Sequence, residues 1–339
     1  MATKKRVVVV GLGSIGRRHT RLLLERGDVA VEVVEPDDGS RSSALAEVGD
    51  LPVHESFDQM LTTTPPIVWI ATPTALHAEQ TIAALAAGAH VFCEKPMSYG
   101  LQDALHMKEA SDRSSKVLNI GFHLHFWPGL AALKRRIESG DLGQVLHAHA
   151  HVGTYITLLN SRSRYQAHKQ GSLVWDYSHQ PDILYWLLQT KPTEVHTVGF
   201  QGGQLERSSN PNVAVVTCRH GPSLISTIHL NYVQMPERHA YEIVGDQGWA
   251  VLDFNEGRLR LGRRKDEQID VEAFSTDRDD IYRAEQQAFF DTIDGNRGPE
   301  TSAADGLVSM QVCESAVESW KTGEWVELGK QMTNDGMTE

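Results

Sequence analysis

Three glycines near the N-terminus are the first residues whose types and spacing could do chemistry. They stand in the segment GLGSIG, residues 11–16, directly after an apolar run and at the start of a helical pattern. In that context the first glycine permits a tight turn, the second lets a pyrophosphate approach the backbone, and the third lets helix and strand pack closely. The helix N–H groups and dipole then face the anion. We expect a dinucleotide here, bound by Gly11, Gly13, Ser14, Ile15 and Gly16; a plain glycine turn is the alternative.

An acidic residue follows the glycines at the spacing expected for a ribose contact. Glu35 ends the second apolar run, about 20 residues after the glycine turn. A carboxylate there accepts hydrogen bonds from ribose hydroxyls and repels a 2′-phosphate, and Asp37 and Asp38 add negative charge. We therefore expect NAD. Arg41 keeps NADP as the alternative, because an arginine near this strand end can bind the additional phosphate.

Two further strand ends carry polar side chains. The segment ATP, residues 71–73, closes one apolar run and leads to His77, and the segment CEKP, residues 93–96, closes the next. Ligands of open parallel sheets bind at the carboxyl ends of the strands. We therefore expect contacts with the nicotinamide end of the cofactor from Thr72, Pro73, His77, Glu94 and Lys95.

The elements that must position these residues alternate between strand and helix. Apolar runs predict strands over residues 6–10, 29–35, 67–71, 90–94 and 117–122, and helical periodicity lies between them over 15–26, 74–87 and 101–114. Such alternation predicts an α/β, doubly wound parallel sheet of the Rossmann type.

The order of predicted helices and strands changes after Phe122. Helices are predicted over residues 128–139, 172–188, 281–293 and 303–321, and strands over 144–156, 194–200, 213–219, 224–230, 240–244 and 249–252. Successive strands without intervening helices predict an α+β domain with a largely antiparallel open sheet. We expect a dinucleotide-binding domain over residues 1–122 and a substrate-binding and oligomerisation domain over 123–339.

An ordered set of segments resembles the Gfo/Idh/MocA family, the glucose-fructose oxidoreductase and inositol dehydrogenase group. These segments are GLGSIGRRH, ATPTALHAEQ, VFCEKPM, SHQPDILYWLL and SWKTGEWVEL, and the likeness runs from residue 6 to about residue 328. The resemblance implies an NAD(P)-dependent oxidoreductase that transfers a hydride to or from a carbinol carbon of a sugar, glycoside or polyol. It also implies a homodimer or homotetramer.

The same resemblance implies three catalytic residues. Lys95 matches the lysine of the EKP motif and His179 the histidine at the start of the helix that lines the substrate pocket. Asp176 precedes that histidine by three residues, where the family more often has four, so Asp182 is the fallback carboxylate. An imidazole can take the hydroxyl proton near neutral pH, and an ammonium can stabilise the developing alkoxide. Read alone, Lys95 could be a solvated side chain and His179 a capping or core histidine.

Two other functions fit the same residues. A glycosidase or lyase could retain NAD and use transient oxidation of the sugar, and a noncatalytic ligand sensor could keep the fold without activity. Retention of the lysine, aspartate and histidine argues against the sensor.

The resemblance to the family is weaker at one segment where substrate would bind. The segment GFHLHFWP, residues 121–128, stands where the family usually reads close to GYNxRFxP, so His123 replaces an amide and His125 an arginine. The further candidate substrate contacts are Arg164, Tyr165 and His168 in the loop before the catalytic helix, with Tyr155, His229 and Tyr232 as weaker ones. For each of these six, a surface side chain without a function is the alternative.

Three alternating histidines form a separate pattern. His147, His149 and His151 project from one face of a predicted strand. A polar face is a better interpretation than a metal site, because no carboxylate or cysteine accompanies them at ligand spacing. We expect no metal.

Charge and composition narrow the partners. A net charge of -12 without a basic stripe argues against nucleic acid. The short apolar run near the N-terminus fits neither a signal peptide nor a membrane span, so we expect a cytoplasmic protein without a membrane partner. The three cysteines, Cys93, Cys218 and Cys313, are scattered and predict buried hydrophobes.

Overall fold

The computed structural model describes residues 4–160, 165–203, 205, 207–266 and 268–329. The chain forms two compact units, one of residues 1–131 and 274–310, the other of residues 132–273 and 311–339. The first unit thus extends past the expected boundary at residue 122 and includes a segment from near the C-terminus. The reason is packing, because Phe289 and Phe290 belong to the apolar core of the first unit.

The first unit contains a six-stranded sheet in the order β3-β2-β1-β4-β5-β6. Every neighbouring pair is parallel. The strands are β1 (Lys5–Val10), β2 (Val29–Val34), β3 (Val53–His54), β4 (Ile67–Ile70), β5 (His90–Glu94) and β6 (Leu118–Gly121). The central β4 is apolar and buried throughout, as a strand covered on both faces must be. The predicted doubly wound sheet is confirmed.

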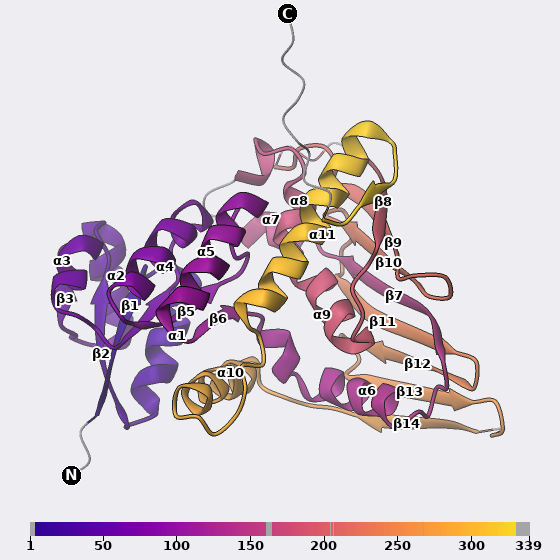
Figure 1. Ribbon diagram of the computed structural model, residues 1–339, viewed down its shortest axis with the longest axis horizontal. Helices are drawn as coiled ribbons and strands as arrows, with labels where there is room; N and C mark the ends of the chain where they lie inside the picture. The colour runs from indigo at the N-terminus through magenta and orange to yellow at the C-terminus, as the bar shows by residue number, and fades with distance from the viewer. Residues whose placement is uncertain (1–3, 161–164, 204, 206, 267, 330–339) are drawn as a thin grey trace, which may run out of the picture. The chain divides into compact units, whose positions relative to one another are not determined.

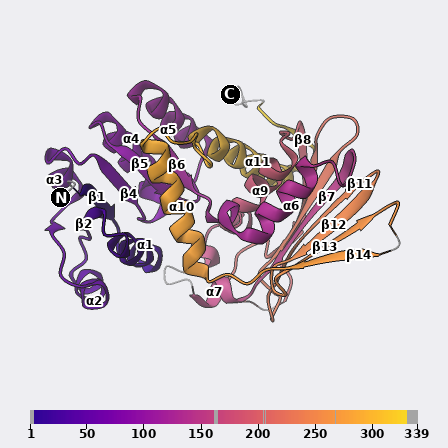
Figure 2. The ribbon, with the colours of Figure 1, turned by 90° about the horizontal axis from the view of Figure 1, so that it is seen from below.

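Helices connect these strands. They are α1 (Ser14–Glu25), α2 (Asp38–Val48), α3 (Phe57–Thr62), α4 (His77–Ala86) and α5 (Leu101–Ser114). A further helix of this unit, α10 (Arg278–Ile293), comes from the later segment 274–310 and connects none of these strands. Helix α1 contacts α2 and α10, whereas α4 contacts α5, a grouping visible in Figure 2. Beneath α1 and α10, Trp69 stacks on Phe92 with a centroid separation of 4.0 Å, and Phe289 meets Trp69 edge-on at 5.4 Å.

The second unit is built on a nine-stranded sheet in the order β14-β13-β12-β11-β7-β10-β9-β8-β15. Strands β7 and β10 pair in parallel, and the other neighbours are antiparallel. The strands are β7 (Val145–Gly153), β8 (Glu194–Phe200), β9 (Val213–Arg219), β10 (Ile225–Asn231), β11 (Arg238–Gly245), β12 (Gly248–Asp253), β13 (Arg258–Arg263), β14 (Ile269–Ala273) and β15 (Val326–Glu327). The prediction of a largely antiparallel sheet is confirmed.

Helices pack on one face of this sheet. They are α6 (Pro128–Glu138), α7 (Ile156–Asn160), α8 (Ser172–Asp176), α9 (His179–Leu188) and α11 (Ala303–Thr322). Helix α9 contacts β7 and β10, and α8 contacts β10. Figures 1 and 2 both show α6, α9 and α11 on the same side of the strands. Among the described residues no helix covers the other face, which we call the open face.

The helix expected over residues 172–188 is interrupted. It separates into α8 and α9, because the N–H of Ser178 bonds to the carbonyl of Trp175 and the N–H of Gln180 to that of Tyr177. These bonds span three residues and not the four of an α-helix, so the turn tightens there. No helix in the described part of the chain is long and apolar enough to span a bilayer.

Candidate functional site

The glycine turn has the geometry expected of a dinucleotide site. Gly11 has a φ of 91°, a left-handed conformation that favours glycine. A Cβ on Gly16 would lie 1.9 Å from the carbonyl oxygen of Gly11, so only glycine fits there without a backbone shift. A Cβ on Gly13 would meet nothing within 4 Å, which leaves room beside its backbone.

The first turn of α1 is open to an anion. Gly13 is its N-cap and supplies no side chain, and α1, which is described in full, has no acidic residue in its first turn. The backbone N–H groups near Ser14 and Ile15 therefore have no side-chain acceptor from the cap. A pyrophosphate group fits this end of the helix.

Glu35 joins the glycine turn to the loop after β2. Its Oε2 accepts a hydrogen bond from the backbone N–H of Leu12 at 2.8 Å, and its Oε1 accepts one from that of Asp37 at 3.2 Å. The carboxylate thus lies beside the turn, where the ribose of a bound dinucleotide is expected.

Two arginines lie close to this loop. Arg41 donates to the backbone oxygen of Glu35 at 2.8 Å and pairs with Asp38. Arg17, which the sequence pattern did not single out, donates from Nε to the carbonyl of Leu12 at 2.9 Å. Both guanidinium groups therefore bind the loop. Their positions alone do not favour one cofactor, NAD or NADP, over the other.

His77 connects the ends of β4 and β5. Its Nε2 lies 2.9 Å from the carbonyl oxygen of Thr72, and its Nδ1 lies 2.8 Å from that of Pro96. The hydroxyl of Thr72 also donates to Gln80 of α4 at 2.7 Å. Both ring nitrogens of His77 thus contact backbone, while Pro73 precedes the short 3-10 helix Thr74–Leu76.

Glu94 is buried behind the backbone of Lys95. Its Oε1 lies 2.7 Å from Nε2 of His19 on α1, and its Oε2 accepts from the N–H of Lys95 at 3.1 Å. Burial favours the protonated carboxyl, but the hydrogen bond with His19 and the electrostatic interactions with His19, His123 and Lys95 together outweigh it and keep the pKa of Glu94 below its usual range. The side chain of Lys95 is partly exposed at this strand end.

The two histidines after β6 have different surroundings. His123 stacks on Tyr282 of α10 with ring centroids 4.7 Å apart. Burial, reinforced by the charges of Lys95 and Arg278, lowers the pKa of His123 to about 3 despite the attraction of Glu94, so this ring is neutral. His125 is buried, with Nδ1 3.9 Å from a carboxylate oxygen of Glu300.

In the second unit, Asp176 ends α8 and His179 begins α9. The carboxylate of Asp176 accepts from Gln166 at 3.1 Å and from the hydroxyl of Tyr232. The His179 ring lies 5.8 Å from that of Tyr177, and both Asp176 and His179 are partly exposed. Gln166 was missed from the sequence because its loop has no periodic pattern, and Tyr232 was only a weak candidate.

The other substrate candidates lie near this helix pair in sequence. Tyr155 is partly exposed, and its N–H bonds to the carbonyl of Gln234 at 2.9 Å. Arg164 and the side chain of Tyr165 lie outside the described residues. Asp182, the fallback carboxylate, is fully buried on α9.

The alternating histidines lie on the open face. His149 contacts the hydroxyl of Thr227 at 2.8 Å through Nδ1, and the rings of His151 and His229 stack with centroids 4.7 Å apart. Within the described part of the chain, no group of three or more histidine, cysteine or acidic side chains is arranged to bind a metal ion.

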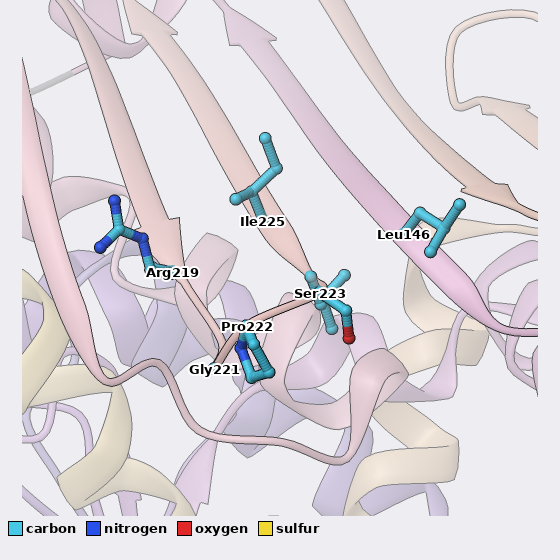
Figure 3. A pocket seen from close by; sticks show the side chains of 7 residues that line it. Leu146, Arg219, Gly221, Pro222, Ser223 and Ile225 are labelled. Carbon is cyan, nitrogen blue, oxygen red and sulfur yellow. The ribbon is translucent and has the colours of Figure 1, made fainter.

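Two cavities lie away from all of these residues. One of about 490 Å³ opens at the turn between β9 and β10, where Figure 3 shows Arg219, Pro222, Ser223 and Ile225 with Leu146 across from them. The other, about 280 Å³, lies between the end of α5 and the start of α11. Neither is lined by a predicted site residue, so neither carries the chemistry expected of the glycine turn and the strand ends.

Comparison with known sequences identifies both parts of the chain. The Gfo/Idh/MocA family profiles match twice, as the NAD-binding Rossmann fold of an oxidoreductase family over residues 5–122 and as its C-terminal alpha/beta domain over residues 134–328. Inositol 2-dehydrogenase 3 of Saccharopolyspora erythraea is 25% identical over 335 residues, which are 95% of each chain. Inositol 2-dehydrogenase of Salmonella typhimurium is 26% identical over 333 residues, 94% of this chain and 96% of the relative.

Solved structures share the fold. An oxidoreductase from Agrobacterium radiobacter, solved with NAD+, L-tartaric acid and magnesium, has a TM-score of 0.88 at 19% identity and covers 96% of this chain and 99% of its own. Levoglucosan dehydrogenase, solved with NADH and levoglucosan, has a TM-score of 0.86 at 19% identity, and the match covers 97% of this chain and 100% of that structure's chain. With both family profiles matched, this chain belongs to the Gfo/Idh/MocA family of NAD-binding oxidoreductases.

Proposed function

We propose that this oxidoreductase transfers a hydride between NAD and a carbinol carbon of a sugar, glycoside or polyol. The main observation that supports NAD binding is the hydrogen bond of 2.8 Å from the glycine turn to the Glu35 carboxylate. This carboxylate lies beside a helix N-terminus that has no side-chain cap. The substrate half is supported by relatives named inositol 2-dehydrogenase and 1,5-anhydro-D-fructose reductase.

The proposed contacts with NAD follow the geometry of the first unit. The glycine turn and the first turn of α1 would bind the pyrophosphate, and Glu35 would accept hydrogen bonds from a ribose. Thr72, Pro73, Glu94 and Lys95 lie at the strand ends, where the nicotinamide is expected. Bound there, NAD would supply the hydride acceptor for oxidation of the carbinol carbon, and NADH would supply the hydride for the reverse reaction.

We assign the proton chemistry to His179 and Lys95. The neutral imidazole of His179 takes the hydroxyl proton during oxidation, and the ammonium of Lys95 stabilises the alkoxide as it develops. Asp176 stabilises the imidazolium that forms. The hydrogen bonds to Asp176 from Tyr232 and Gln166 orient that carboxylate.

A substrate screen tests this proposal. The full chain is incubated with NAD or NADP and with neutral sugars, glycosides, polyols and nucleotide sugars, while absorbance of the reduced nicotinamide is followed. Net formation of NADH with one of these substrates is the expected result. Turnover of a glycoside without net change in the cofactor would instead support a glycosidase or lyase that retains NAD.

Two substitutions separate chemistry from cofactor binding. His179→Asn removes the titratable base, so NAD affinity should persist while kcat falls by about 10² to 10⁴ and loses its neutral-range pH dependence. Lys95→Met should likewise reduce kcat more than NAD affinity. An unchanged rate and pH profile in the His179 variant would refute the catalytic assignment.

We also propose that the protein self-associates through the open face as a homodimer or homotetramer. Exposed apolar side chains support this, among them Val198 at 62% and Phe200 at 58% exposure on β8. Phe200→Lys should therefore shift the mass measured by light scattering at micromolar concentration, while Val53→Lys, in the first unit, should not. A monomeric wild-type protein would refute the proposal.

A further inference from the structure

The His77 ring contacts two backbone carbonyl groups and interacts with the Cys93 side chain. Its two nitrogens lie 2.9 Å and 2.8 Å from the carbonyl oxygens of Thr72 and Pro96, and the residue is 1% exposed. A neutral imidazole has one N–H, so its second nitrogen would direct a lone pair at a carbonyl lone pair. An imidazolium has two N–H groups and satisfies both oxygens. The geometry therefore calls for the charged ring.

The surroundings explain how a charged ring is tolerated in the interior. Burial disfavours the cation, but the Cys93 side chain and the two carbonyl oxygens outweigh burial and raise the pKa of His77 to about 9. These groups come from β5 and from the segments that follow β4 and β5. Among the described residues no carboxylate forms an ion pair with His77.

The helix does not account for this charge. His77 is the first residue of α4, and the N-terminus of a helix carries the positive end of the dipole. A cation is disfavoured there, so the Cys93 side chain and the two carbonyl groups must provide the favourable interaction. Such charge-assisted bonds are stronger than bonds between neutral groups.

The two bonds join segments that bear predicted site residues. Thr72 follows β4, and Pro96 directly follows Lys95 at the end of β5. Gln80, one turn further along α4, bonds to the hydroxyl of Thr72, so α4 contacts that residue through two side chains. Loss of one N–H from His77 would release either Thr72 or the segment after Lys95.

We propose that His77 is an imidazolium throughout the neutral range and acts as a positioning residue, holding the backbone beside Lys95 against the end of β4. This role replaces the direct contact with the cofactor that its position suggested. The charge state follows from the ring contacts alone, whereas the effect on turnover rests on the proposed function.

The charge state is tested on the wild-type protein. Nitrogen-15 spectra of the full chain, with the His77 signals assigned by their loss in His77→Gln, should show both ring nitrogens protonated from pH 6 to pH 8. Deprotonation should follow as the pH rises through about 9. A nonprotonated ring nitrogen at pH 7 would overturn the inference, whether or not any substrate is turned over.

The positioning role is tested by turnover. A glutamine at position 77 offers one donor and one acceptor to two carbonyls, so kcat should fall about tenfold or more while affinity for ADP-ribose is retained. The alkaline decline in wild-type kcat near pH 9 should also be absent from this variant. His106→Gln, at an exposed position of α5, is the matched control and should behave like wild type. A His77 variant with wild-type kcat and the same alkaline profile would refute positioning, whereas a wild-type protein inactive on all substrates would refute the proposed function.

Discussion

Two substitutions of Glu35 distinguish its structural role in the glycine turn from its expected role in cofactor selection. Its carboxylate accepts a hydrogen bond from the N–H of Leu12, a fully buried residue, and it is expected to contact the cofactor ribose. Glu35→Ala removes the acceptor and the charge, whereas Glu35→Gln removes the charge and keeps an oxygen that can accept from Leu12. The two variants should therefore differ in stability and agree in cofactor preference.

The stability difference follows from the single bond to Leu12. A buried N–H left without an acceptor costs about 1–3 kcal/mol. For a unit of this size that corresponds to a decrease in Tm of about 2–4 °C per kcal/mol. Glu35→Ala should show this loss in thermal unfolding without cofactor, and Glu35→Gln should show little of it.

The cofactor preference follows from charge. A carboxylate within about 4 Å of a phosphate charge contributes on the order of 1 kcal/mol of repulsion in water and more where solvent is restricted. Both variants should therefore lower the ratio of NAD to NADP affinity about tenfold or more, as measured by calorimetric titration with each cofactor. Glu55→Gln, which removes an exposed carboxylate from the same unit, is the control. An unchanged affinity ratio in both variants would refute the assignment of Glu35 to cofactor selection.

Three other substitutions test separate parts of the structure. Gly16→Ala places a Cβ 1.9 Å from the carbonyl of Gly11, so it should destabilise the protein by about 1–3 kcal/mol and weaken NAD binding; normal values of both would contradict the close packing. Glu285 is fully buried, neither carboxylate oxygen has a hydrogen-bond partner among the described residues, and burial and then Glu94 raise its pKa well above 4.5. In the unfolded chain the Glu285 carboxyl ionises above pH 4.5, whereas in the folded state it keeps its proton, so it lowers the stability of the fold as the pH rises. The Tm of Glu285→Gln relative to wild type should therefore increase from pH 5 to pH 8. A constant difference in Tm would count against a protonated carboxyl. Tyr232→Phe removes a buried donor to Asp176, so both Tm and kcat should fall, and a variant equal to wild type in both would show that the bond is dispensable.

The first sheet could be predicted from sequence because its signals are local. A buried parallel strand is a short apolar run, and the glycine turn needs specific residues at adjacent positions. No bounds were predicted for helix α2, because only Ala44 is buried along it and its apolar periodicity is correspondingly weak. Strands β13 and β14 were missed because their exposed arginines and acids resemble a loop.

The site contacts could be predicted only as positions at strand ends. The pattern ATPTALH places His77 near β4, but the second ring contact, to Pro96, depends on how β5 pairs with β4. Likewise, the hydrogen bond to the Asp176 carboxylate comes from Tyr232, which lies 56 residues later in the chain. Such partners are brought together by tertiary packing, which residue spacing alone does not encode.

The discontinuity of the first unit has a consequence for how the protein is made. Residues 1–131 emerge from the ribosome well before α10, because residues 132–273 must be synthesised in between. Until then the aromatic surface formed by Trp69 and Phe92 lacks Phe289, which covers it in the finished fold. A nascent chain therefore carries an uncovered apolar patch throughout synthesis of the second unit, a surface that holdase chaperones recognise and that promotes aggregation. Chains terminated before residue 278 would leave that patch uncovered permanently, so premature termination should produce insoluble protein and not an isolated cofactor-binding unit.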